Sequence, residues 1–409
     1  NISDHNTIIR RFYYESTKVA KVTLNVPLPP ETFSSFFPRT TPETEARMQD
    51  KVSCCMRRPC DAQATRCHRI RRLTGRPLYP HPPRTQFDVM TNIAFIGAGD
   101  VANLHAEAVS ACAQAQLCGL WTIDEAQAAE KSERFGCRTY PSAAALLDDD
   151  TIDAVFILTP LETHHEYACQ ALESGKHILV EKPVSTDAAQ IGEIRDLAAK
   201  RDLVCMPGHN YIYEPGMTRI KEMLDAGKLG RIVSVYILYN IAHAEHIAAR
   251  YPGVISQIMT HHTYALMYLV GTPVRLSAMK ATLNYETITQ ENIATVNLQL
   301  ADGALAHFSA SFAADDHAGD PWTMMAKVIG TEGAARYSYR DWVEYRAAGA
   351  HSQVYTAYHE SIRNEVDFFV NRCLGAGETP LSTMDDACRA SDIVAAIERA
   401  AETGETISL

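Results

Sequence analysis

The stretch that decides the fold is Met90-Thr91-Asn92-Ile93-Ala94-Phe95-Ile96-Gly97-Ala98-Gly99-Asp100-Val101-Ala102. Its apolar run predicts a buried strand, a G-x-G-x-x-A turn follows, and a helical pattern then continues to about residue 113. Glycines permit such a tight turn and the close approach of a pyrophosphate, whose charge the start of the helix stabilises. This pattern predicts a dinucleotide-binding turn made by Gly97, Gly99, Asp100, Val101 and Ala102.

Beyond this turn, short apolar runs alternate with helical patterns. Strands are expected at residues 93–96, 117–123, 154–158, 177–180 and 203–206, with helices between them. This βαβ rhythm favours a doubly wound parallel sheet in an α/β fold. After about residue 208, alternating stretches at 232–239, 294–300 and 304–312 favour an antiparallel sheet. A last helix is expected at 384–401, with its cap at Gly404.

Composition and charge narrow the classes of partner. The 409 residues carry a net charge of minus 11, but residues 1–89 carry 15 Lys/Arg against 8 Asp/Glu, which leaves minus 18 on the rest. A part of the chain with so much negative charge repels nucleic acid and anionic membranes. The sequence also contains no run of about 18 apolar residues, so no membrane span is predicted. Eleven cysteines without a paired spacing suit a reducing compartment, so we expect a cytoplasmic protein with a small-molecule substrate.

Residues 1–89 differ from the rest of the chain. They are rich in Pro, Arg and Thr, show no sustained periodicity, and are expected to be an irregular basic extension, either a leader or non-native, with Met90 as the native start. A transit peptide is the competing explanation, but its acidic residues count against it. The spacing of Cys54, Cys55, Cys60, Cys67 and His68 matches no regular zinc finger, so no metal site is predicted there.

The end of the second predicted strand bears on cofactor choice. In Trp121-Thr122-Ile123-Asp124, Asp124 could reach the adenosine ribose of NAD, whereas Thr122 stands where an acidic residue is expected and tolerates a 2′-phosphate. Both are candidate cofactor-binding residues, and both NAD and NADP remain open.

Two further strand ends fall at the carboxyl edge of the sheet, where doubly wound folds bind ligands. They are Thr159-Pro160 and Glu181-Lys182-Pro183, and we assign Thr159, Pro160, Glu181 and Lys182 to the nicotinamide end of the cofactor site. A lysine at this edge could also hold a substrate oxygen and stabilise a developing alkoxide. The alternative is that Lys182 is a solvated surface lysine.

These motifs together resemble those of the glucose-fructose oxidoreductase, inositol dehydrogenase and rhizopine-catabolism (Gfo/Idh/MocA) family. The resemblance rests on Gly97-Ala98-Gly99-x-x-Ala102-x-x-His105, Thr159-Pro160-x-x-x-His164 and Gly175-Lys176-His177-Ile178-Leu179-Val180-Glu181-Lys182-Pro183, and it runs from about residue 90 to the end. It implies a Rossmann domain at 90–209, with His164 in the cofactor site, and a substrate-binding and oligomerisation α+β domain at 210–409 with a largely antiparallel open sheet. The last helix is expected to pack back on the Rossmann domain, and homodimers or homotetramers are expected.

The resemblance also implies a catalytic set. Lys182 would orient the substrate and the nicotinamide, and His261 would take the hydroxyl proton during oxidation. Gln257 stands where the family commonly has Asp, and a neutral amide can orient a hydroxyl but cannot stabilise a neighbouring imidazolium as a carboxylate can.

Other residues of the second half are assigned to the substrate: His209, Tyr211 and His262. A metal held by His261 and His262 is not predicted, because adjacent side chains on a regular backbone point apart. Ile212 replaces an Arg that is frequent in the family, which argues against a strongly anionic substrate.

The predicted function is hydride transfer between NAD or NADP and a hydroxyl or keto group of a sugar, sugar derivative or cyclitol. Two alternatives stay open: a redox-assisted glycosidase or lyase that retains its cofactor, and a non-catalytic sensor of dinucleotide or sugar. Net production of NAD(P)H separates the dehydrogenase from both.

Overall fold

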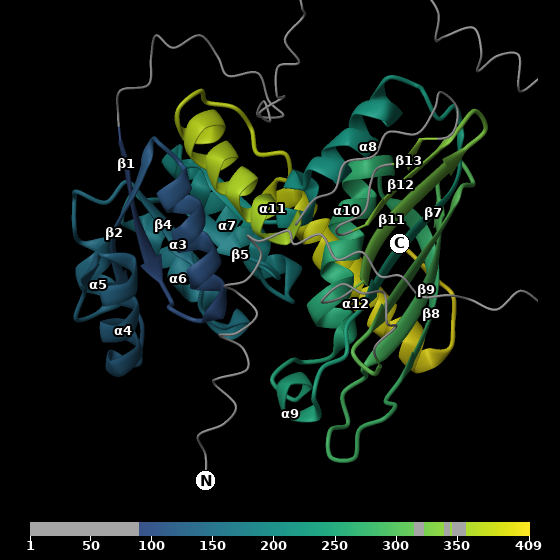
Figure 1. The fold of residues 1–409 in the computed structure, drawn as a ribbon, viewed down its shortest axis with the longest axis horizontal. Helices are drawn as coiled ribbons and strands as arrows, with labels where there is room; N and C mark the ends of the chain where they lie inside the picture. Colours follow the sequence, from purple (N-terminus) through teal and green to yellow (C-terminus); the bar gives the residue numbers. More distant parts are fainter. Residues whose placement is uncertain (1–89, 315–322, 339–343, 346–356) are drawn as a thin grey trace, which may run out of the picture. The chain divides into compact units, whose positions relative to one another are not determined.

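A computed structural model describes residues 90–314, 323–338, 344–345 and 357–409. The cysteine-rich stretch at residues 54–68 lies outside the described residues, as does the whole of the extension at 1–89. The described residues form two β-sheets with their helices, which Figure 1 shows as separate layers.

The first sheet is parallel and has the strand order β3-β2-β1-β4-β5-β6. Its strands are β1 (Thr91–Ile96), β2 (Ala115–Trp121), β3 (Arg138–Thr139), β4 (Ala154–Ile157), β5 (His177–Glu181) and β6 (Cys205–Gly208). The connections are η1 (Leu161–Thr163), α3 (Asp100–Ala111), α4 (Glu125–Phe135), α5 (Ala143–Leu147), α6 (His164–Glu173) and α7 (Ala188–Arg201). This is the doubly wound order, with a change of direction between β1 and β4 that opens a ligand crevice at their carboxyl ends.

The predicted strand at 117–123 begins and ends two residues earlier in the structure. Ile123 is 91% exposed, because the chain leaves the sheet after Trp121 and turns toward α4. Asp124 is the N-cap of that helix and accepts hydrogen bonds from the amides of Ala126 and Gln127. The apolar pattern alone predicted a strand to residue 123, but the strand ends earlier because Asp124 caps the helix that follows.

The second sheet has the order β13-β12-β11-β7-β10-β9-β8-β14, and only its β7–β10 pair is parallel among the described strands. Its strands are β7 (Ile232–Asn240), β8 (Pro273–Ala281), β9 (Ile293–Leu300), β10 (Leu305–Ser311), β11 (Thr323–Gly330), β12 (Ala334–Ser338), β13 (Glu344–Tyr345) and β14 (Ile407–Ser408). The predicted fold class, a doubly wound parallel sheet followed by a largely antiparallel one, is confirmed.

Helices cover one face of the second sheet. The described helices that follow β6 are η2 (Asn210–Tyr213), α8 (Pro215–Asp225), α9 (Glu245–Ala248), η3 (Ile255–Met259), α10 (Thr260–Val270), α11 (Ala357–Asp367), η4 (Phe368–Leu374) and α12 (Met384–Thr403). Figure 1 shows α8, α10 and α12 on the same side of this sheet, and α12 contacts both β8 and α7. A capping box at Thr383 starts α12 and Gly404 ends it in the left-handed conformation, as predicted.

Alternating side chains divide the core between the two faces of the first sheet. Ala94 and Ile96 pack with the buried faces of α6 and α7. Phe95 stacks on Phe156 at a ring distance of 5.5 Å, on the opposite face. The cluster on that opposite face continues into the helices and inner face of the second sheet. One apolar cluster therefore joins this face of the first sheet to the second half of the chain.

Candidate active site

The two glycines of the turn between β1 and α3 meet different requirements. Gly97 has a φ of +102°, and a Cβ atom there would lie 2.6 Å from the carbonyl carbon and oxygen of Leu158. Gly99 has a φ of −66°, and a Cβ atom there would meet nothing within 4 Å. The turn is therefore tight against the end of β4 at its first glycine and open at its second, where α3 begins.

This opening fits a phosphate group. The first amides of a helix lack partners within the helix, and the helix dipole places partial positive charge there. Ala102 is fully buried, which brings the first turn of α3 close to the sheet, whereas Asp100 is exposed and Val101 half-buried at the rim. The residues present thus suit a dinucleotide whose pyrophosphate lies over Gly99.

A cleft of about 850 Å³ runs from this turn along the carboxyl edge of the sheet. It is lined by most of the predicted cofactor-binding residues: Asp100, Val101, Thr159, Pro160, His164, Glu181 and Lys182. We call it the nucleotide cleft. Its far end is lined by Tyr251, Ser256, Gln257 and Tyr358, which come from the second half of the chain.

Thr122 and Asp124 do not line this cleft. The Thr122 hydroxyl donates to the Gln127 side-chain oxygen at 3.2 Å, and the Asp124 carboxylate caps α4. Both predicted ribose contacts are therefore engaged in local bonds at the end of β2.

Lys182 is held by contacts from both halves of the chain. Its amide donates to the Glu181 carboxylate at 2.9 Å, and its Nζ donates to the backbone carbonyl of Gln257 at 3.4 Å. The other Glu181 oxygen lies 2.9 Å from Nε2 of His105, which is fully buried in α3. Glu181 is thus fixed between α3 and Lys182, so the lysine is a positioned group and not a freely solvated one.

His164 joins two strand ends beneath the cleft. Its Nδ1 lies 2.8 Å from the carbonyl of Pro183, and its Nε2 lies 2.8 Å from the carbonyl of Thr159. The ring is buried, and these contacts hold the residues after β4 and β5 at a fixed separation. His164 therefore both lines the cleft and links the strand ends that carry Thr159 and Lys182.

A smaller cavity of about 200 Å³ adjoins the nucleotide cleft and brings the predicted catalytic residues together. Lys182, Gln257, His261 and Tyr211 all line it. The other lining residues are Tyr239, Ile241, His243, Tyr251, Ile258, Phe312 and Tyr358. We call it the catalytic cavity. It shares Lys182, Tyr251, Gln257 and Tyr358 with the end of the nucleotide cleft, so the two spaces are contiguous.

A π-helical turn shapes this cavity. Residues Ile255–Met259 form η3, and α10 begins at once with Thr260. A π-turn rotates the residues that follow it, and such turns are frequent at functional sites. Here Gln257 and His261 lie on the cavity side, and the Gln257 carbonyl contacts Lys182.

The electrostatics favour a neutral histidine beside a buried lysine whose charge is balanced by a carboxylate. Burial lowers the pKa of His261 well below its usual value, and the nearby Lys182 lowers it further. Burial also lowers the pKa of Lys182, while the Glu181 carboxylate opposes that shift. His261 is therefore unprotonated at neutral pH and available as a proton acceptor.

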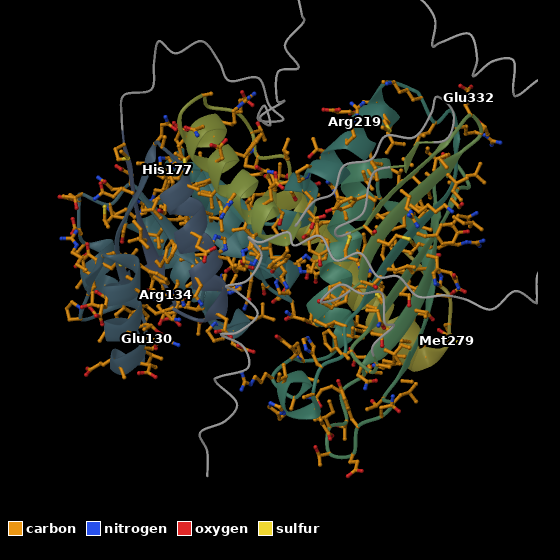
Figure 2. All side chains as sticks on the ribbon, in the orientation of Figure 1. Glu130, Arg134, His177, Arg219, Met279 and Glu332 are labelled. Atoms are coloured by element: carbon orange, nitrogen blue, oxygen red, sulfur yellow. The ribbon has the colours of Figure 1, made fainter. Side chains whose placement is uncertain are left out.

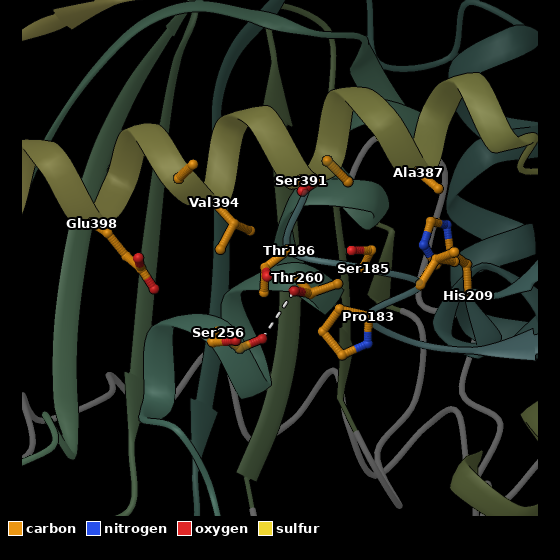
Figure 3. A pocket seen from close by; sticks show the side chains of 13 residues that line it. Pro183, Ser185, Thr186, His209, Ser256, Thr260, Ala387, Ser391, Val394 and Glu398 are labelled. Atoms are coloured by element: carbon orange, nitrogen blue, oxygen red, sulfur yellow. Dashed lines mark hydrogen bonds between the residues drawn. The ribbon is translucent and has the colours of Figure 1, made fainter. Parts of the chain in front are cut away.

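His209, a predicted substrate residue, does not line the catalytic cavity. Its ring stacks on Tyr264 at 4.1 Å, its Nδ1 lies 2.6 Å from the Ser382 hydroxyl, and burial lowers its pKa to about 3. It lines a separate small cavity of about 60 Å³, shown in Figure 3, with room for about two water molecules. Figure 3 also shows the hydrogen bond from the Thr260 hydroxyl to the Ser256 carbonyl, four residues earlier in the chain, along one wall of this cavity.

His262 points away from His261. It is fully buried, its ring meets Phe308 edge-on at 5.4 Å, and burial lowers its pKa to about 3. It lines neither the catalytic cavity nor the nucleotide cleft. The structure therefore does not bring this predicted substrate residue to the others.

Several cavity residues were not among the sequence-based candidates. Tyr239 comes from β7 and Tyr358 from α11, and the pattern around each predicts only a strand or a helix. Tyr264 does not line the cavity but contacts His261, which it follows by three positions, and in a helix that spacing places two side chains on one face. The sequence therefore contained a signal that Tyr264 lies near His261.

Neither a cluster of metal-ligating side chains nor a membrane-spanning helix is found in the part of the chain that the structure describes. No group of three or more His, Cys, Asp or Glu side chains there could hold a metal ion. None of the helices in these described ranges has the length and apolar character to cross a bilayer.

Both halves of the chain match one protein family. Residues 91–209 match the family described as "Oxidoreductase family, NAD-binding Rossmann fold", and residues 217–336 match the "GFO/IDH/MocA C-terminal domain".

Individual proteins are also similar to this chain in sequence or in fold. An inositol 2-dehydrogenase of Rhizobium meliloti is 27% identical over 291 residues, which cover 67% of this chain and 86% of the relative. A dTDP-3,4-didehydro-2,6-dideoxy-alpha-D-glucose 3-reductase of Streptomyces violaceoruber is 25% identical over 339 residues, or 76% and 95% of the two chains. The structure of levoglucosan dehydrogenase with NADH and levoglucosan is similar in fold, with a TM-score of 0.69 at 22% identity, over 78% of this chain and 99% of that one.

Proposed function

Because the chain belongs to the Gfo/Idh/MocA family of NAD-binding oxidoreductases, we propose that it transfers hydride between NAD or NADP and a hydroxyl or keto group of a sugar, sugar derivative or cyclitol. The observation that carries the proposal is the catalytic cavity, where Lys182 and His261 meet beside the nucleotide cleft.

The chemistry of the cavity walls supports a neutral polyol. Among the described lining residues, Lys182 is the one Lys, Arg, Asp or Glu side chain, and the others are aromatic, aliphatic, amide or imidazole groups. Tyrosine rings combine an apolar face with a hydroxyl, which suits the alternating C–H and O–H groups of a sugar. Ile212 is fully buried and offers no cation for a phosphate or carboxylate.

In the proposed reaction, the substrate hydroxyl lies between Lys182 and His261. A bound nicotinamide ring supplies the hydride acceptor for oxidation. His261, neutral in its buried position, accepts the hydroxyl proton, and the Lys182 ammonium stabilises the oxygen as it gains negative charge. Gly97, Gly99 and the start of α3 would hold the pyrophosphate, while Thr159, Pro160 and Glu181 border the nicotinamide end.

The proposal is tested with purified chain. NADH and NADPH are titrated by fluorescence, and a panel of sugars and inositols is then screened for net nicotinamide reduction. Polyol-dependent reduction supports a dehydrogenase. Bond cleavage of a glycoside with tightly bound cofactor and no net reduction would replace it with the redox-assisted glycosidase or lyase. Ligand binding without either reaction would replace it with the sensor.

The Lys182→Ala variant then tests the assigned residue, with Lys200→Ala as the matched control because Lys200 is exposed at the end of α7. We expect Lys182→Ala to lose turnover and retain nucleotide binding, and the control to keep both. Full turnover in Lys182→Ala would refute its role.

The open face of the second sheet supports a homodimer or homotetramer. No helix in the described ranges covers this face, which carries Tyr236, Met279 and Leu305, and Met279, labelled in Figure 2, is 77% exposed. Large exposed apolar side chains gathered on one sheet face are typical of an interaction surface. We propose that two copies pair through this face.

A cytoplasmic location is supported by the thiols. The seven cysteines of the described residues are all free, and burial raises the pKa of Cys137 to about 11 and that of Cys373 to about 12. Such protonated, partly buried thiols suit a compartment that keeps cysteines reduced.

A further inference from the structure

We propose that Tyr264 is the positioning residue of His261: its hydroxyl holds the proton of His261 on Nδ1 and so leaves Nε2 free to accept the substrate proton. The proposal rests on the proposed function, in which His261 is the base. It answers a question left by the sequence, namely what orients the histidine when Gln257 stands in place of a carboxylate.

The contacts of His261 identify its partner. Nδ1 lies 2.5 Å from the Tyr264 hydroxyl, which is buried three residues further along α10. The imidazole stacks on the Tyr211 ring at 4.1 Å, and the Tyr264 ring stacks on His209 at 4.1 Å. Within the described residues, the Gln257 side chain makes no hydrogen bond to His261; its backbone carbonyl contacts Lys182 instead. The phenol therefore occupies the position of the orienting group.

A chain of hydrogen bonds determines which atom carries the proton. The Ser361 hydroxyl donates its one hydrogen to the carbonyl of Tyr358 at 2.7 Å, so it can only accept from Asn210. The Asn210 side chain donates to this hydroxyl from Nδ2 at 3.0 Å. Because Nδ2 faces Ser361, the Oδ1 atom of Asn210 faces Tyr264. An amide oxygen only accepts, so the Tyr264 hydroxyl donates to it, at 3.3 Å. With its hydrogen committed, Tyr264 must accept from His261, and Nδ1 must be the protonated nitrogen.

The acceptor capacity of Tyr264 is consistent with this direction. A hydroxyl oxygen has two lone pairs. One accepts from the Tyr211 amide at 3.2 Å, and the other accepts from Nδ1 of His261. All three hydrogen-bonding positions of the hydroxyl are then used. In the other tautomer of His261, the lone pair of Nδ1 would face a lone pair of the Tyr264 oxygen, which is unfavourable.

Tyr264 is suited to a fixed orienting role because it stays neutral. Burial raises its pKa well above the usual value for a tyrosine, and the neighbouring Tyr211 raises it further. A neutral phenol sets the tautomer but does not stabilise an imidazolium as a carboxylate would. His261 accordingly remains a weak base whose proton is passed on readily.

The tautomer is measured by nitrogen-15 NMR on the full chain with labelled histidine, and His261→Gln identifies the resonances. We expect a protonated Nδ1 and a bare Nε2 at neutral pH. A protonated Nε2 with a bare Nδ1 would overturn the proposal. The measurement needs no substrate, so a failure of the proposed function, shown by the absence of polyol oxidation, is distinguishable from a failure of this inference.

Tyr264→Phe removes the hydroxyl and keeps the ring. We expect the His261 resonances to shift toward the other tautomer, and kcat to fall roughly fivefold to tenfold, as for the loss of one neutral hydrogen bond, with unchanged nucleotide affinity. The matched control is Tyr213→Phe, since Tyr213 is equally buried and its hydroxyl contacts the Met206 sulfur at 3.5 Å. An unchanged tautomer and rate in Tyr264→Phe would refute the role, and if that variant fails to fold, the tautomer of the natural chain decides alone.

Discussion

Replacing Gly97 by alanine would drive a methyl group into the backbone at the end of β4. The added Cβ would lie 2.6 Å from the carbonyl carbon and oxygen of Leu158 and 2.7 Å from the amide nitrogen of Thr159. Ordinary carbon contacts are about 3.5–4.0 Å, so the turn and the strand must separate by roughly 1 Å. The φ of +102° adds about 1–2 kcal/mol or more for a residue with a side chain.

These two effects together predict a loss of about 3–5 kcal/mol in the free energy of unfolding, and a fall of roughly 10 °C in Tm. Gly99→Ala is the matched variant, because its φ of −66° suits alanine and no atom lies within 4 Å of the new Cβ. At a helix N-cap that change costs about 1 kcal/mol or less. Its methyl group would instead occupy the opening over the start of α3.

The two variants therefore separate folding from binding. Thermal unfolding without nucleotide should show a large loss for Gly97→Ala and a small one for Gly99→Ala. Titration with NADH should show at least about a tenfold weaker Kd for Gly99→Ala, equivalent to about 1.4 kcal/mol. The reasoning fails if Gly97→Ala unfolds within about 2 °C of the natural chain, or if Gly99→Ala binds NADH with unchanged affinity.

Three more results are expected. Because burial lowers the pKa of His261 well below 6.5, the neutral base persists as pH falls through that value, and kcat/KM for polyol oxidation should stay flat there; an acid limb centred near pH 6.5 would contradict this. Glu181→Gln removes the carboxylate that raises the pKa of Lys182, so the alkaline limb of the same profile should move to lower pH, and an unmoved or higher limb would count against the pairing. Met279→Asp should dissociate the proposed oligomer in light scattering. Leu283→Asp should not, because Leu283 is also apolar and exposed (51% against 77%) but lies outside the strands; an intact oligomer in Met279→Asp would remove the open face as its interface.

The glycine turn and the strand ends could be predicted from sequence because their chemistry is local. Gly97 and Gly99 stand between an apolar run and a helical pattern, and Lys182 directly follows a buried strand. In a parallel sheet all such strand ends reach one edge, so their proximity follows from the topology. Asp124 does not line the cleft for an equally local reason, because its carboxylate accepts the capping hydrogen bonds of α4.

The surroundings of His261 could not be predicted in the same way. The π-turn at η3 has no established residue signature, and it decides that Gln257 presents its carbonyl to Lys182. Adjacent histidines in sequence become separated, because His262 faces the sheet at Phe308. The Ser361 hydroxyl, which determines the proton position on His261, lies 100 residues further along the chain, and only the tertiary fold brings it to Asn210.

The packing of α11 on α3 has a consequence for synthesis at the ribosome. The apolar face of the first sheet around Phe156 is closed by Phe369, which meets it edge-on at 5.7 Å and follows α11 directly. The nucleotide-binding half is complete in sequence long before this cover emerges. A nascent chain that has not yet reached residue 369 therefore leaves this aromatic surface uncovered, and we expect it to be prone to aggregation at that stage.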